Sequence, residues 1–570
     1  MSYSDNQSVQ ILISLLKEFK VRHAVLSPGS RNVPVVHSLE KDPDFSCYSI
    51  VDERSAAYFG LGLALETGEP VLISCTSGTA TTNYTSAMWE ASKQNLPLIA
   101  LTSDRNQYFL GQLEDQMIVQ PNMYGAACRK SVTLPIVKDE QDAWYCRRLV
   151  NEALLALRHR DGGPVQINLP TEWGLFAQNF NTPELPKVRP FHRFTRRDMA
   201  SGPISALDEI RSKKRILVLV GQGRAVSEEY QRSIEEFFRK YPCAIAIETI
   251  SNLHMDGAIN TSLISRSLSK EMFLEYAPDL VISVGRNYVS TVKGLLKGCA
   301  SDFEHWTINE DGAVVDQFRK LTAIFECSPD EFFAYMSLHA EDGDPDRSYL
   351  NFWQSRIGSL PKPVFPYSSN YIMQEFLQRL PEGSILHYGN GVAVHVAQYF
   401  ASHPSIVTYC HSGTTTIDGS LSTFIGQASV SKRLCFALIG DLSFFYDMNA
   451  IWNRYVDSNV RILLYNNEGG GTFHWNNARD IDTLPLHTSA EHFATAKGWV
   501  ESLGFKYLSA RTKEEFDRQL PEFLATDLEL PVCFEVFTKK DLDGKSLHEY
   551  YDQCRQHLLD SNDLPKDENS

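Results

Sequence analysis

The sequence predicts an α/β protein made of doubly wound parallel sheets, and three observations carry that prediction. Apolar runs of about five residues recur along the chain, each followed by Gly, Ser, Thr, Asp or Asn. Stretches with helical periodicity, such as residues 53–66 and 226–241, lie between them. Strands that alternate with helices form a parallel sheet. Proline-rich polar segments at residues 179–197 and 342–366 suit linkers, so we expect three domains.

The expected strands are defined by the apolar runs and by the polar residues that end them. In chain order they are Val71–Cys75, Leu98–Leu101, Ile216–Val220, Leu280–Val284, Leu434–Ile439 and Ile462–Tyr465. Ligands of parallel sheets bind at the carboxyl ends of strands, where these polar clusters fall. The two proline-rich segments place the domains at residues 1–180, 198–341 and 367–560. The middle domain is expected to be structural. Its Gly221-Gln222-Gly223 turn begins like the dinucleotide-binding fingerprint G-x-G-x-x-G, but Val226 stands where the third glycine is required.

Composition narrows the class of partner. The chain has 570 residues, of which 43% are hydrophobic and 22% charged, as expected of a globular protein. Its net charge of −16 disfavours a nucleic-acid partner. The apolar runs are too short for a membrane helix, the N-terminus lacks a basic signal region, and the eleven cysteines are dispersed without a CxxC pair. We therefore expect a cytoplasmic protein with reduced thiols and small-molecule partners.

The strongest local signal is a pair of motifs, Gly440-Asp441-Leu442-Ser443 and Asn466-Asn467-Glu468-Gly469. Both follow expected strands, and their spacing suits one strand–helix–strand unit. Mg²⁺ prefers oxygen ligands, which Asp441, the Asn467 amide and a carbonyl near Gly469 would supply. The glycines and Ser443 would admit a diphosphate to backbone N–H groups. A Gly-Asp pair alone is usually a turn, but its pairing with Asn-Asn predicts a metal and diphosphate site.

These motifs resemble the Gly-Asp-Gly…Asn-Asn signature of thiamine diphosphate (ThDP) enzymes, with Leu442 in place of the second glycine. Nearly the whole chain is similar to the MenD family, the 2-succinyl-5-enolpyruvyl-6-hydroxy-3-cyclohexene-1-carboxylate (SEPHCHC) synthases. The segments that carry this resemblance are Leu26–Arg31, Val51–Ala57, Cys75–Ala80, Leu101–Arg105, Ile417–Gly419, Gly440–Phe444 and Asn466–Gly471. The resemblance implies pyrimidine-binding, central and diphosphate-binding domains. It also implies a homodimer or homotetramer, since different subunits of such enzymes hold the two ends of the cofactor.

The implied activity is that of a ThDP-dependent transferase of menaquinone biosynthesis, with Mg²⁺ or Mn²⁺ as the metal. It would decarboxylate 2-oxoglutarate and add the succinyl semialdehyde carbanion equivalent to isochorismate. The resemblance assigns Glu53 to the pyrimidine ring of the cofactor, where a carboxylate drives the tautomer that takes a proton. A solvated glutamate in the first turn of a helix is the ordinary alternative.

The remaining site residues are also implied by the resemblance. The cofactor-binding set is Thr76, Ser77, Gly78, Asn390, Ile417, Gly440, Asp441, Leu442, Ser443, Asn467 and Phe473, with Asp441, Asn467 and Gly469 as metal ligands. The substrate-binding set is Ser30, Arg31, Arg105, Gln116, Lys293 and His395. Arginine suits polyanionic substrates because its planar fork binds carboxylates bidentately. The alternatives are a turn for Thr76–Gly78, core packing for Ile417 and Phe473, and surface ion pairs for the cations.

Two positions depart from the family pattern. The family commonly has Gly-Asn-Ser with Arg four residues later, where this chain has Gly389-Asn390-Gly391 and His395, and an Arg where this chain has Ser412. Those arginines are expected to hold the side-chain carboxylate of 2-oxoglutarate. The interpretations are a local misalignment, replacement by another cation such as protonated His411, or a different 2-oxo acid donor. A non-catalytic ThDP-binding protein is a further alternative, disfavoured because Glu53, Asp441 and Asn467 are all present.

Overall fold

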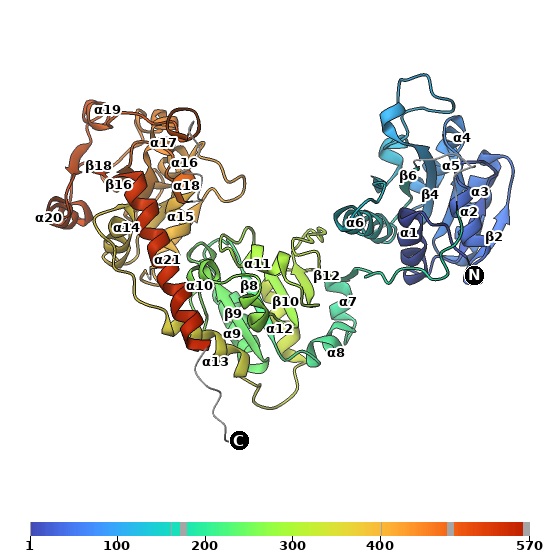
Figure 1. The fold of residues 1–570 in the computed structure, drawn as a ribbon, viewed down its shortest axis with the longest axis horizontal. Coiled ribbons are helices and arrows are strands. Elements are labelled where there is room, and N and C mark those ends of the chain that lie inside the picture. The colour runs from blue at the N-terminus through green and yellow to red at the C-terminus, as the bar shows by residue number, and fades with distance from the viewer. Residues whose placement is uncertain (1, 161, 172–178, 401, 476–483, 563–570) are drawn as a thin grey trace. The chain divides into compact units, whose positions relative to one another are not determined.

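Three six-stranded sheets form the framework of the protein (Figure 1). The computed structural model describes residues 2–160, 162–171, 179–400, 402–475 and 484–562. The chain forms two compact units, unit 1 from residues 1–194 and 313–324 and unit 2 from residues 195–312 and 325–570. The predicted α/β class with parallel sheets is confirmed. The domain boundaries at residues 180, 198, 341 and 367 stay a prediction.

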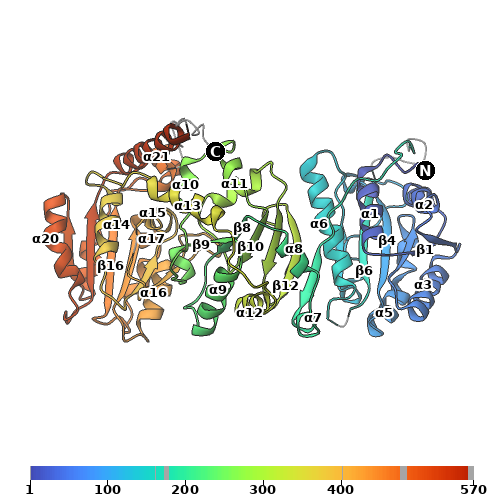
Figure 2. The same cartoon turned by 90° about the horizontal axis from the view of Figure 1, so that it is seen from below.

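The first sheet lies in unit 1 and has the strand order β2-β1-β3-β4-β6-β5. Its strands are β1 (His23–Leu26), β2 (Ser46–Ser49), β3 (Val71–Cys75), β4 (Leu98–Arg105), β5 (Lys130–Thr133) and β6 (Val165–Thr171). Its helices are α1 (Gln7–Glu18), α2 (Val33–Glu40), α3 (Glu53–Thr67), α4 (Thr79–Thr82), α5 (Thr85–Lys93) and α6 (Glu140–Ala156). Alternate side chains of β3 explain the layers: Leu72 packs with α1, α2 and α6, whereas Val71 and Ile73 pack with α3 and α5 on the other face. Figure 2 shows helices beside the strands of this sheet.

The second sheet has the order β7-β12-β11-β10-β8-β9. Its strands are β7 (His192–Thr195), β8 (Ile216–Val220), β9 (Cys243–Ile247), β10 (Leu280–Val284), β11 (Glu304–Ile308) and β12 (Leu321–Glu326). The helices of this region are α7 (Arg196–Ala200), α8 (Ala206–Arg211), α9 (Glu228–Lys240), α10 (Ser262–Ser267), α11 (Val292–Gly298), α12 (Pro329–Leu338) and α13 (Ser348–Ser359). The central strands β8 and β10 are almost wholly buried because helices cover both faces.

The third sheet lies in unit 2 and has the order β14-β13-β15-β16-β18-β17. Its strands are β13 (Ile385–Tyr388), β14 (Val407–Cys410), β15 (Cys435–Gly440), β16 (Val460–Asn466), β17 (Lys506–Ala510) and β18 (Val532–Phe537). Its helices are α14 (Ser369–Gln378), α15 (Val392–Ala397), α16 (Ser420–Ala428), α17 (Asp441–Tyr446), α18 (Gly471–Trp475), α19 (Lys497–Ser502), α20 (Lys513–Leu524) and α21 (Lys540–Asn562).

The first and third sheets share one topology. Counted from its own first strand, each has the order 2-1-3-4-6-5. In such a sheet the chain changes direction between the first and third strands, and ligands bind outside the carboxyl ends of that pair. The pair is β1 and β3 in unit 1, and β13 and β15 in unit 2. The topology therefore places a candidate site at the edge of each sheet formed by the carboxyl ends of its strands, beside this pair.

All six expected strands are present, and two differences from the expected boundaries have a physical reason. The strand expected to end at Leu101 continues to Arg105, because it pairs with β6 as far as Thr171. Residues 342–366 are more than an extended linker, because α13 occupies Ser348–Ser359 and buries Tyr349, Leu350 and Trp353. The prolines of that segment lie outside the helix. Within the described ranges, we find no helix that is both long and apolar enough to span a membrane.

A buried histidine makes the stability of the third sheet depend on pH. His387 in β13 is 5% exposed and stacks on Tyr409 with 5.3 Å between ring centroids. Burial lowers the pKa of His387 from 6.5 to about 4. Below pH 6.5 the unfolded chain therefore binds a proton that the folded chain excludes, so stability present at neutral pH is lost as the pH falls towards 4.

We expect His387→Gln to lose less stability on acidification than the wild type does. Between pH 7 and pH 5 the difference should be about 2 kcal/mol, since one pKa unit corresponds to about 1.4 kcal/mol. The measurement is urea unfolding at both pH values, followed by tryptophan fluorescence. The control is His403→Gln, which changes an exposed histidine of the same unit. Equal losses in the wild type and His387→Gln would contradict the prediction.

Candidate functional site

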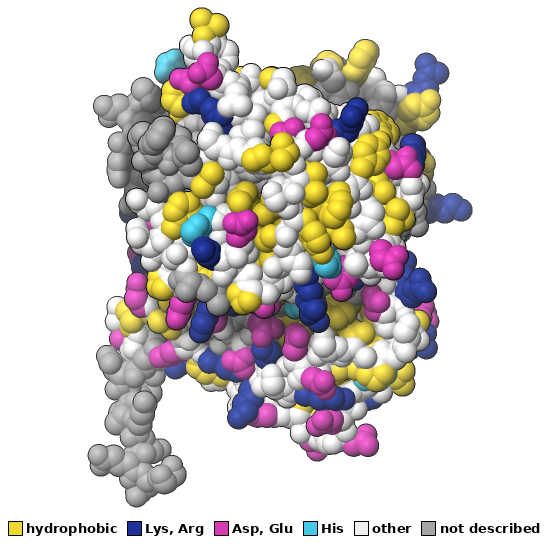
Figure 3. Space-filling model, turned by 90° about the vertical axis from the view of Figure 1, so that its right-hand side faces the viewer, with side chains coloured by type: hydrophobic (Ala, Val, Ile, Leu, Met, Phe, Trp, Pro, Cys, Tyr) yellow, Lys and Arg dark blue, Asp and Glu magenta, His cyan; other side chains and the backbone are white. Residues whose placement is uncertain are grey.

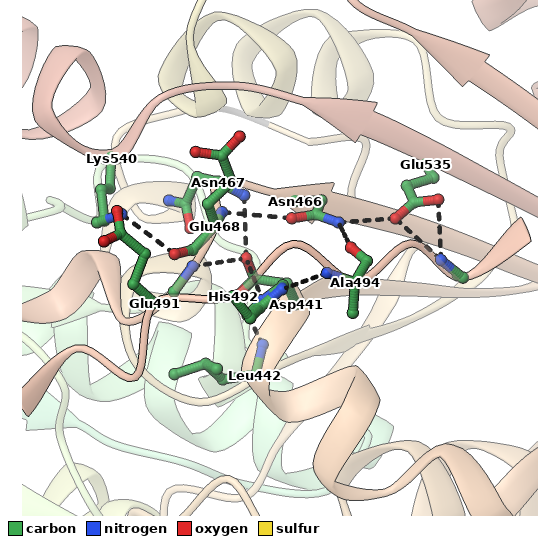
Figure 4. Close-up of polar contacts among 12 residues, drawn as sticks. Asp441, Leu442, Asn466, Asn467, Glu468, Glu491, His492, Ala494, Glu535 and Lys540 are labelled. Atoms are coloured by element: carbon green, nitrogen blue, oxygen red, sulfur yellow. Dashed lines mark hydrogen bonds and ion pairs between the residues drawn. The ribbon is translucent and has the colours of Figure 1, made fainter. Parts of the chain in front are cut away.

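Asp441 organises the carboxyl ends of β15 and β16 (Figure 4). Its side chain is 2% exposed, and its Oδ2 accepts hydrogen bonds from the backbone N–H of Asn467 at 3.1 Å and of Gly469 at 2.9 Å. Its Oδ1 accepts from the N–H of Leu442 at 2.6 Å. These bonds tie the loop after β16 to the start of α17. The structure thus brings together the three expected metal ligands, which come from two neighbouring strand ends.

The side chain of Asn467 is held in one orientation by a residue that sequence reasoning missed. Asp543, in the first turn of α21, accepts a hydrogen bond from Asn467 Nδ2 at 3.0 Å. Asp543 also accepts from the Ser369 N–H at 2.8 Å and the Thr538 hydroxyl at 3.0 Å, and burial raises its pKa. Since Nδ2 faces Asp543, the opposite atom of the amide, Oδ1, faces away from it. That oxygen is buried and has no hydrogen-bond partner in the described structure.

An unpartnered buried amide oxygen beside a buried carboxylate is a donor set that suits a hard divalent cation. Asp441 supplies the negative charge, and Asn467 Oδ1 supplies the unused lone pairs. His492 also approaches Asp441, with 3.3 Å between Nε2 and Oδ2. Asn466 is less suited as a ligand, because its Oδ1 already accepts the Glu468 N–H at 3.3 Å, while its Nδ2 donates to Glu535 at 2.8 Å and to the Ala494 carbonyl at 2.9 Å (Figure 4). Of the two adjacent asparagines, therefore, Asn467 fits the metal site.

The other cofactor-binding residues expected in unit 2 lie around the same edge of the third sheet. Gly440 ends β15, Leu442 is half-buried, and Ser443 is buried in α17. Asn390 precedes α15 at the end of β13, the neighbour of β15. Ile417 is half-buried in the loop after β14, and Phe473 is 36% exposed in α18. Apart from the Leu442 N–H, which donates to Asp441 Oδ1, these residues form no hydrogen bond with Asp441 in the described structure, and their cofactor-binding roles stay predictions.

His395 does not supply the charge of the arginine that it replaces. It lies one turn into α15, and its pKa falls from 6.5 to about 4 because it is buried and faces the positive charges of Arg266 and Lys293. The imidazole is therefore neutral at pH 7. Lys293 in α11 is half-buried, and burial lowers its pKa. The structure thus brings these two predicted substrate-binding residues near each other and adds Arg266.

The second departure, Ser412, is buried against the second sheet. Its hydroxyl donates to Gln222 Oε1 at 2.5 Å, and its carbonyl accepts from the amide of Asn287. The neighbouring His411 is held at both ring nitrogens, 3.1 Å from the Asp418 carbonyl and 2.8 Å from the Thr423 hydroxyl. Neither residue therefore takes the place of the missing arginine in this arrangement.

In unit 1, Thr76, Ser77 and Gly78 form the turn after β3, at the edge that the topology selects. Ser77 Oγ donates to the Gln116 carbonyl at 3.0 Å. Gly78 has a φ of +78°, and an added Cβ would lie 3.0 Å from the same carbonyl. Only glycine therefore fits this position without strain. The turn and Gln116 form one structural element.

Sequence reasoning also missed a buried amide network beneath this turn. Gln120 is fully buried, and its Oε1 accepts the Gly78 N–H at 2.8 Å. Its Nε2 donates to Asn168 Oδ1 at 3.0 Å, and Asn168 Nδ2 donates to Asp104 Oδ2 at 2.9 Å. The network fixes the turn relative to the end of β4. Its members come from distant parts of the chain, so no local motif reveals it.

Two arginines meet at the same edge of unit 1. Arg31 is 8% exposed, and it donates to Gln116 Oε1 at 2.5 Å. Burial and the nearby charge of Arg105 lower the pKa of Arg31. Arg105 forms an ion pair of 2.9 Å with Glu114. Arg31 and Arg105 form a corner beside the turn, in which the carboxylates of Asp104, Glu114 and Asp115 also act on Arg31. The two guanidinium groups suit an anionic ligand.

The two remaining predicted residues of unit 1 form no hydrogen bond or ion pair with that corner in the described part of the chain. Ser30 is exposed in the loop after β1, and Glu53 is half-buried at the first position of α3. Both follow strands of the same sheet, β1 and β2, so they lie at its carboxyl edge. Asp52 caps α3 by accepting the Ser55 N–H at 2.8 Å. The cap leaves the Glu53 carboxylate free of a helix-capping role.

Comparisons with known proteins agree with this geometry. Residues 7–123 match the family model described as thiamine pyrophosphate enzyme, N-terminal TPP binding domain. Over 564 residues the chain is 37% identical to a 2-succinyl-5-enolpyruvyl-6-hydroxy-3-cyclohexene-1-carboxylate synthase of Bacteroides fragilis, covering 97% of this chain and 100% of that protein. A protein of the same name from Bacteroides thetaiotaomicron is 37% identical with the same coverage. One from Desulfotalea psychrophila is 31% identical, covering 91% of this chain and 97% of its own length.

Proposed function

Because the chain belongs to the SEPHCHC synthase family of thiamine diphosphate enzymes, we propose that it joins 2-oxoglutarate to isochorismate with loss of CO₂. The product would be SEPHCHC, an intermediate of menaquinone biosynthesis. The observation that carries the proposal is the group formed by Asp441, Asn467 and Gly469. The buried Asp441 carboxylate accepts the N–H groups of Asn467 and Gly469, and Asn467 Oδ1 has no hydrogen-bond partner in the described structure. It is the donor set that a metal-bound diphosphate requires.

Each residue has a definite part in the proposed reaction. Asp441, Asn467 Oδ1 and the Gly469 carbonyl would hold Mg²⁺ or Mn²⁺, with Ser443 beside the diphosphate. Thiamine diphosphate, when bound, supplies the electron sink that makes decarboxylation possible. Glu53 would hold a hydrogen bond to the pyrimidine nitrogen, and so control the protonation of the ring.

The other predicted residues would bind the organic part of the cofactor and the substrates. Thr76–Gly78, Asn390, Ile417 and Phe473 would line the cofactor. Arg31, Arg105, Gln116, Ser30 and Lys293 would bind the carboxylates of isochorismate. Two observations support an anion-binding corner. Arg31 donates a hydrogen bond to Gln116, and Arg31 and Arg105 are close enough for the charge of Arg105 to lower the pKa of Arg31.

The replacement at His395 favours a second candidate function, in which a related enzyme uses another 2-oxo acid or another acceptor. The His395 imidazole is neutral and Ser412 is tied to the second sheet, so neither pairs with a distal carboxylate. The test is turnover of 2-oxoglutarate, pyruvate and 2-oxobutyrate with isochorismate, monitored as CO₂ release. Preference for 2-oxoglutarate supports SEPHCHC synthesis, and preference for a monocarboxylic donor supports the alternative.

A homodimer or homotetramer in the cytoplasm completes the proposal. The helices α3 and α5 expose large apolar side chains, with Tyr58 43%, Phe59 41% and Trp89 42% exposed. Hydrophobic side chains also gather across the face drawn in Figure 3. Apolar patches of this kind suit a subunit interface. Light scattering of the purified protein tests this, and a stable monomer would contradict it. All eleven cysteines are free thiols, which suits a reducing compartment.

A further inference from the structure

Three basic side chains gather around one tryptophan in unit 2. The Arg266 guanidinium, from α10, lies 4.0 Å from the ring centroid of Trp475, at the end of α18. The His395 ring, from α15, lies 4.9 Å from the same indole. Arg266 and Lys293 both act electrostatically on His395, so Lys293 belongs to the same cluster. Arg266 is the one member that the sequence motifs do not indicate.

The positive charge of this cluster is not balanced by nearby carboxylates. In the described part of the chain, neither Arg266 nor Lys293 forms an ion pair, although both are half-buried. The carboxyl that acts on Lys293 is Glu248, whose two oxygens accept the N–H groups of Val289 at 2.7 Å and Ser290 at 2.5 Å. Arg266 shares a hydrogen bond with the Tyr399 side chain, but a partly buried cation without a carboxylate partner remains costly unless a ligand supplies the anion. In a protein of net charge −16, such a cluster indicates an anion-binding subsite.

The cluster is adjacent to the proposed metal site. The helix α18 begins at Gly471, where an added Cβ would lie 2.9 Å from Asn467 Nδ2, and it ends at Trp475. Five helical residues span about 6 Å, so Trp475 is about one turn along α18 from Gly471, the residue beside the Asn467 side chain. The helix α15, which carries His395, follows β13, the strand beside β15. A small molecule that reacts beside the metal site is therefore within reach of these basic groups.

Of the three basic side chains, Arg266 is best suited to bind a carboxylate. The His395 imidazole is neutral at pH 7. Lys293 faces Glu248, which partly offsets its charge. The Arg266 guanidinium lies over an indole face and shares a hydrogen bond with Tyr399, and the other N–H donors of its five remain for a carboxylate. The stacking also restricts the side chain before a ligand arrives, which lowers the entropic cost of binding.

We propose that Arg266 binds the distal carboxylate of a dicarboxylic 2-oxo acid, and so determines donor specificity from the α10 helix. It takes over the task of the arginines that His395 and Ser412 replace. This inference rests on the proposed function, because it assigns the donor of that reaction. With Arg266 in this role, the chain could use 2-oxoglutarate even though His395 and Ser412 stand where the family has arginines.

The test compares the wild type with Arg266→Met, which keeps the length of the side chain and removes its charge. We expect the KM for 2-oxoglutarate to rise roughly 10- to 100-fold, as on loss of a charge-assisted hydrogen bond, with kcat changed less than about threefold. The inhibition constant of 2-oxopentanoate, which has the same carbon chain without the distal carboxylate, should stay within about twofold. Arg266→Lys should recover part of the loss.

Arg215→Met is the matched control. Arg215 is half-buried and stacks on Tyr349 at 4.8 Å, but it precedes β8 at the opposite edge of its sheet from the strand ends. Its KM for 2-oxoglutarate should equal that of the wild type. An unchanged KM in Arg266→Met, or equal weakening of 2-oxoglutarate and 2-oxopentanoate, would overturn the inference, the second outcome because it indicates a structural role. A wild-type enzyme that does not turn over 2-oxoglutarate contradicts the proposed function itself.

Discussion

Glu53→Gln is expected to lower turnover with 2-oxoglutarate and isochorismate by roughly 1,000-fold, within the range for loss of a proton-transfer group. The amide has nearly the shape of the carboxylate, but it cannot carry the negative charge that favours a protonated pyrimidine nitrogen. The position supports this role, since Glu53 is half-buried at the first residue of α3 and Asp52 provides the cap. Binding of thiamine diphosphate, measured by tryptophan fluorescence, should change by less than about tenfold, because one hydrogen bond is altered.

Glu66→Gln provides the control for that experiment. Glu66 is exposed near the other end of α3, so the same chemical change there removes a carboxylate without touching the strand edge. It should turn over like the wild type. If Glu53→Gln also kept wild-type turnover, the non-catalytic alternative would gain support. Parallel loss of turnover and cofactor binding would indicate that Glu53 holds the cofactor without a part in proton transfer.

The fold was predictable because its signals are local. Strand β3 has the predicted bounds Val71–Cys75, and β8 has the bounds Ile216–Val220, since buried parallel strands appear as short apolar runs. The helix α13 was not predicted, because the prolines around it dominate the composition of that segment. Strand β4 was predicted too short, because its last residues are polar and are held in the sheet by pairing with β6.

The site was predictable only where its residues form motifs. Asp441 and Asn467 stand out because each follows a strand, and the parallel sheet then places the strand ends together. Asp543, Gln120 and Arg266 have no such signal. Each acts on a residue far away in the sequence through a hydrogen bond or a ring contact that exists only after folding. Their identification requires three-dimensional coordinates.

Asp441→Asn is expected to weaken metal-dependent binding of thiamine diphosphate roughly 100-fold, the scale of a charge-assisted interaction lost from a buried site. Two effects combine. The carboxylate charge that attracts the cation disappears, and the new amide has one acceptor oxygen for the three N–H groups of Leu442, Asn467 and Gly469 that Asp441 accepts. The NH₂ group would then face backbone donors, so the loop that presents Asn467 loses its anchor.

The measurement is a titration of thiamine diphosphate at several Mg²⁺ concentrations, followed by tryptophan fluorescence. Because the metal and the diphosphate bind together, high Mg²⁺ should recover part of the lost affinity in Asp441→Asn. Asp457→Asn is the control, since Asp457 is exposed and, among the described residues, its carboxylate accepts only the local N–H of Ser458, at 2.6 Å. Cofactor affinity in Asp441→Asn equal to that of the control would remove Asp441 from the proposed metal site. Weaker affinity that does not respond to Mg²⁺ would assign Asp441 to loop structure alone, and would leave Asn467 Oδ1 without its proposed cation.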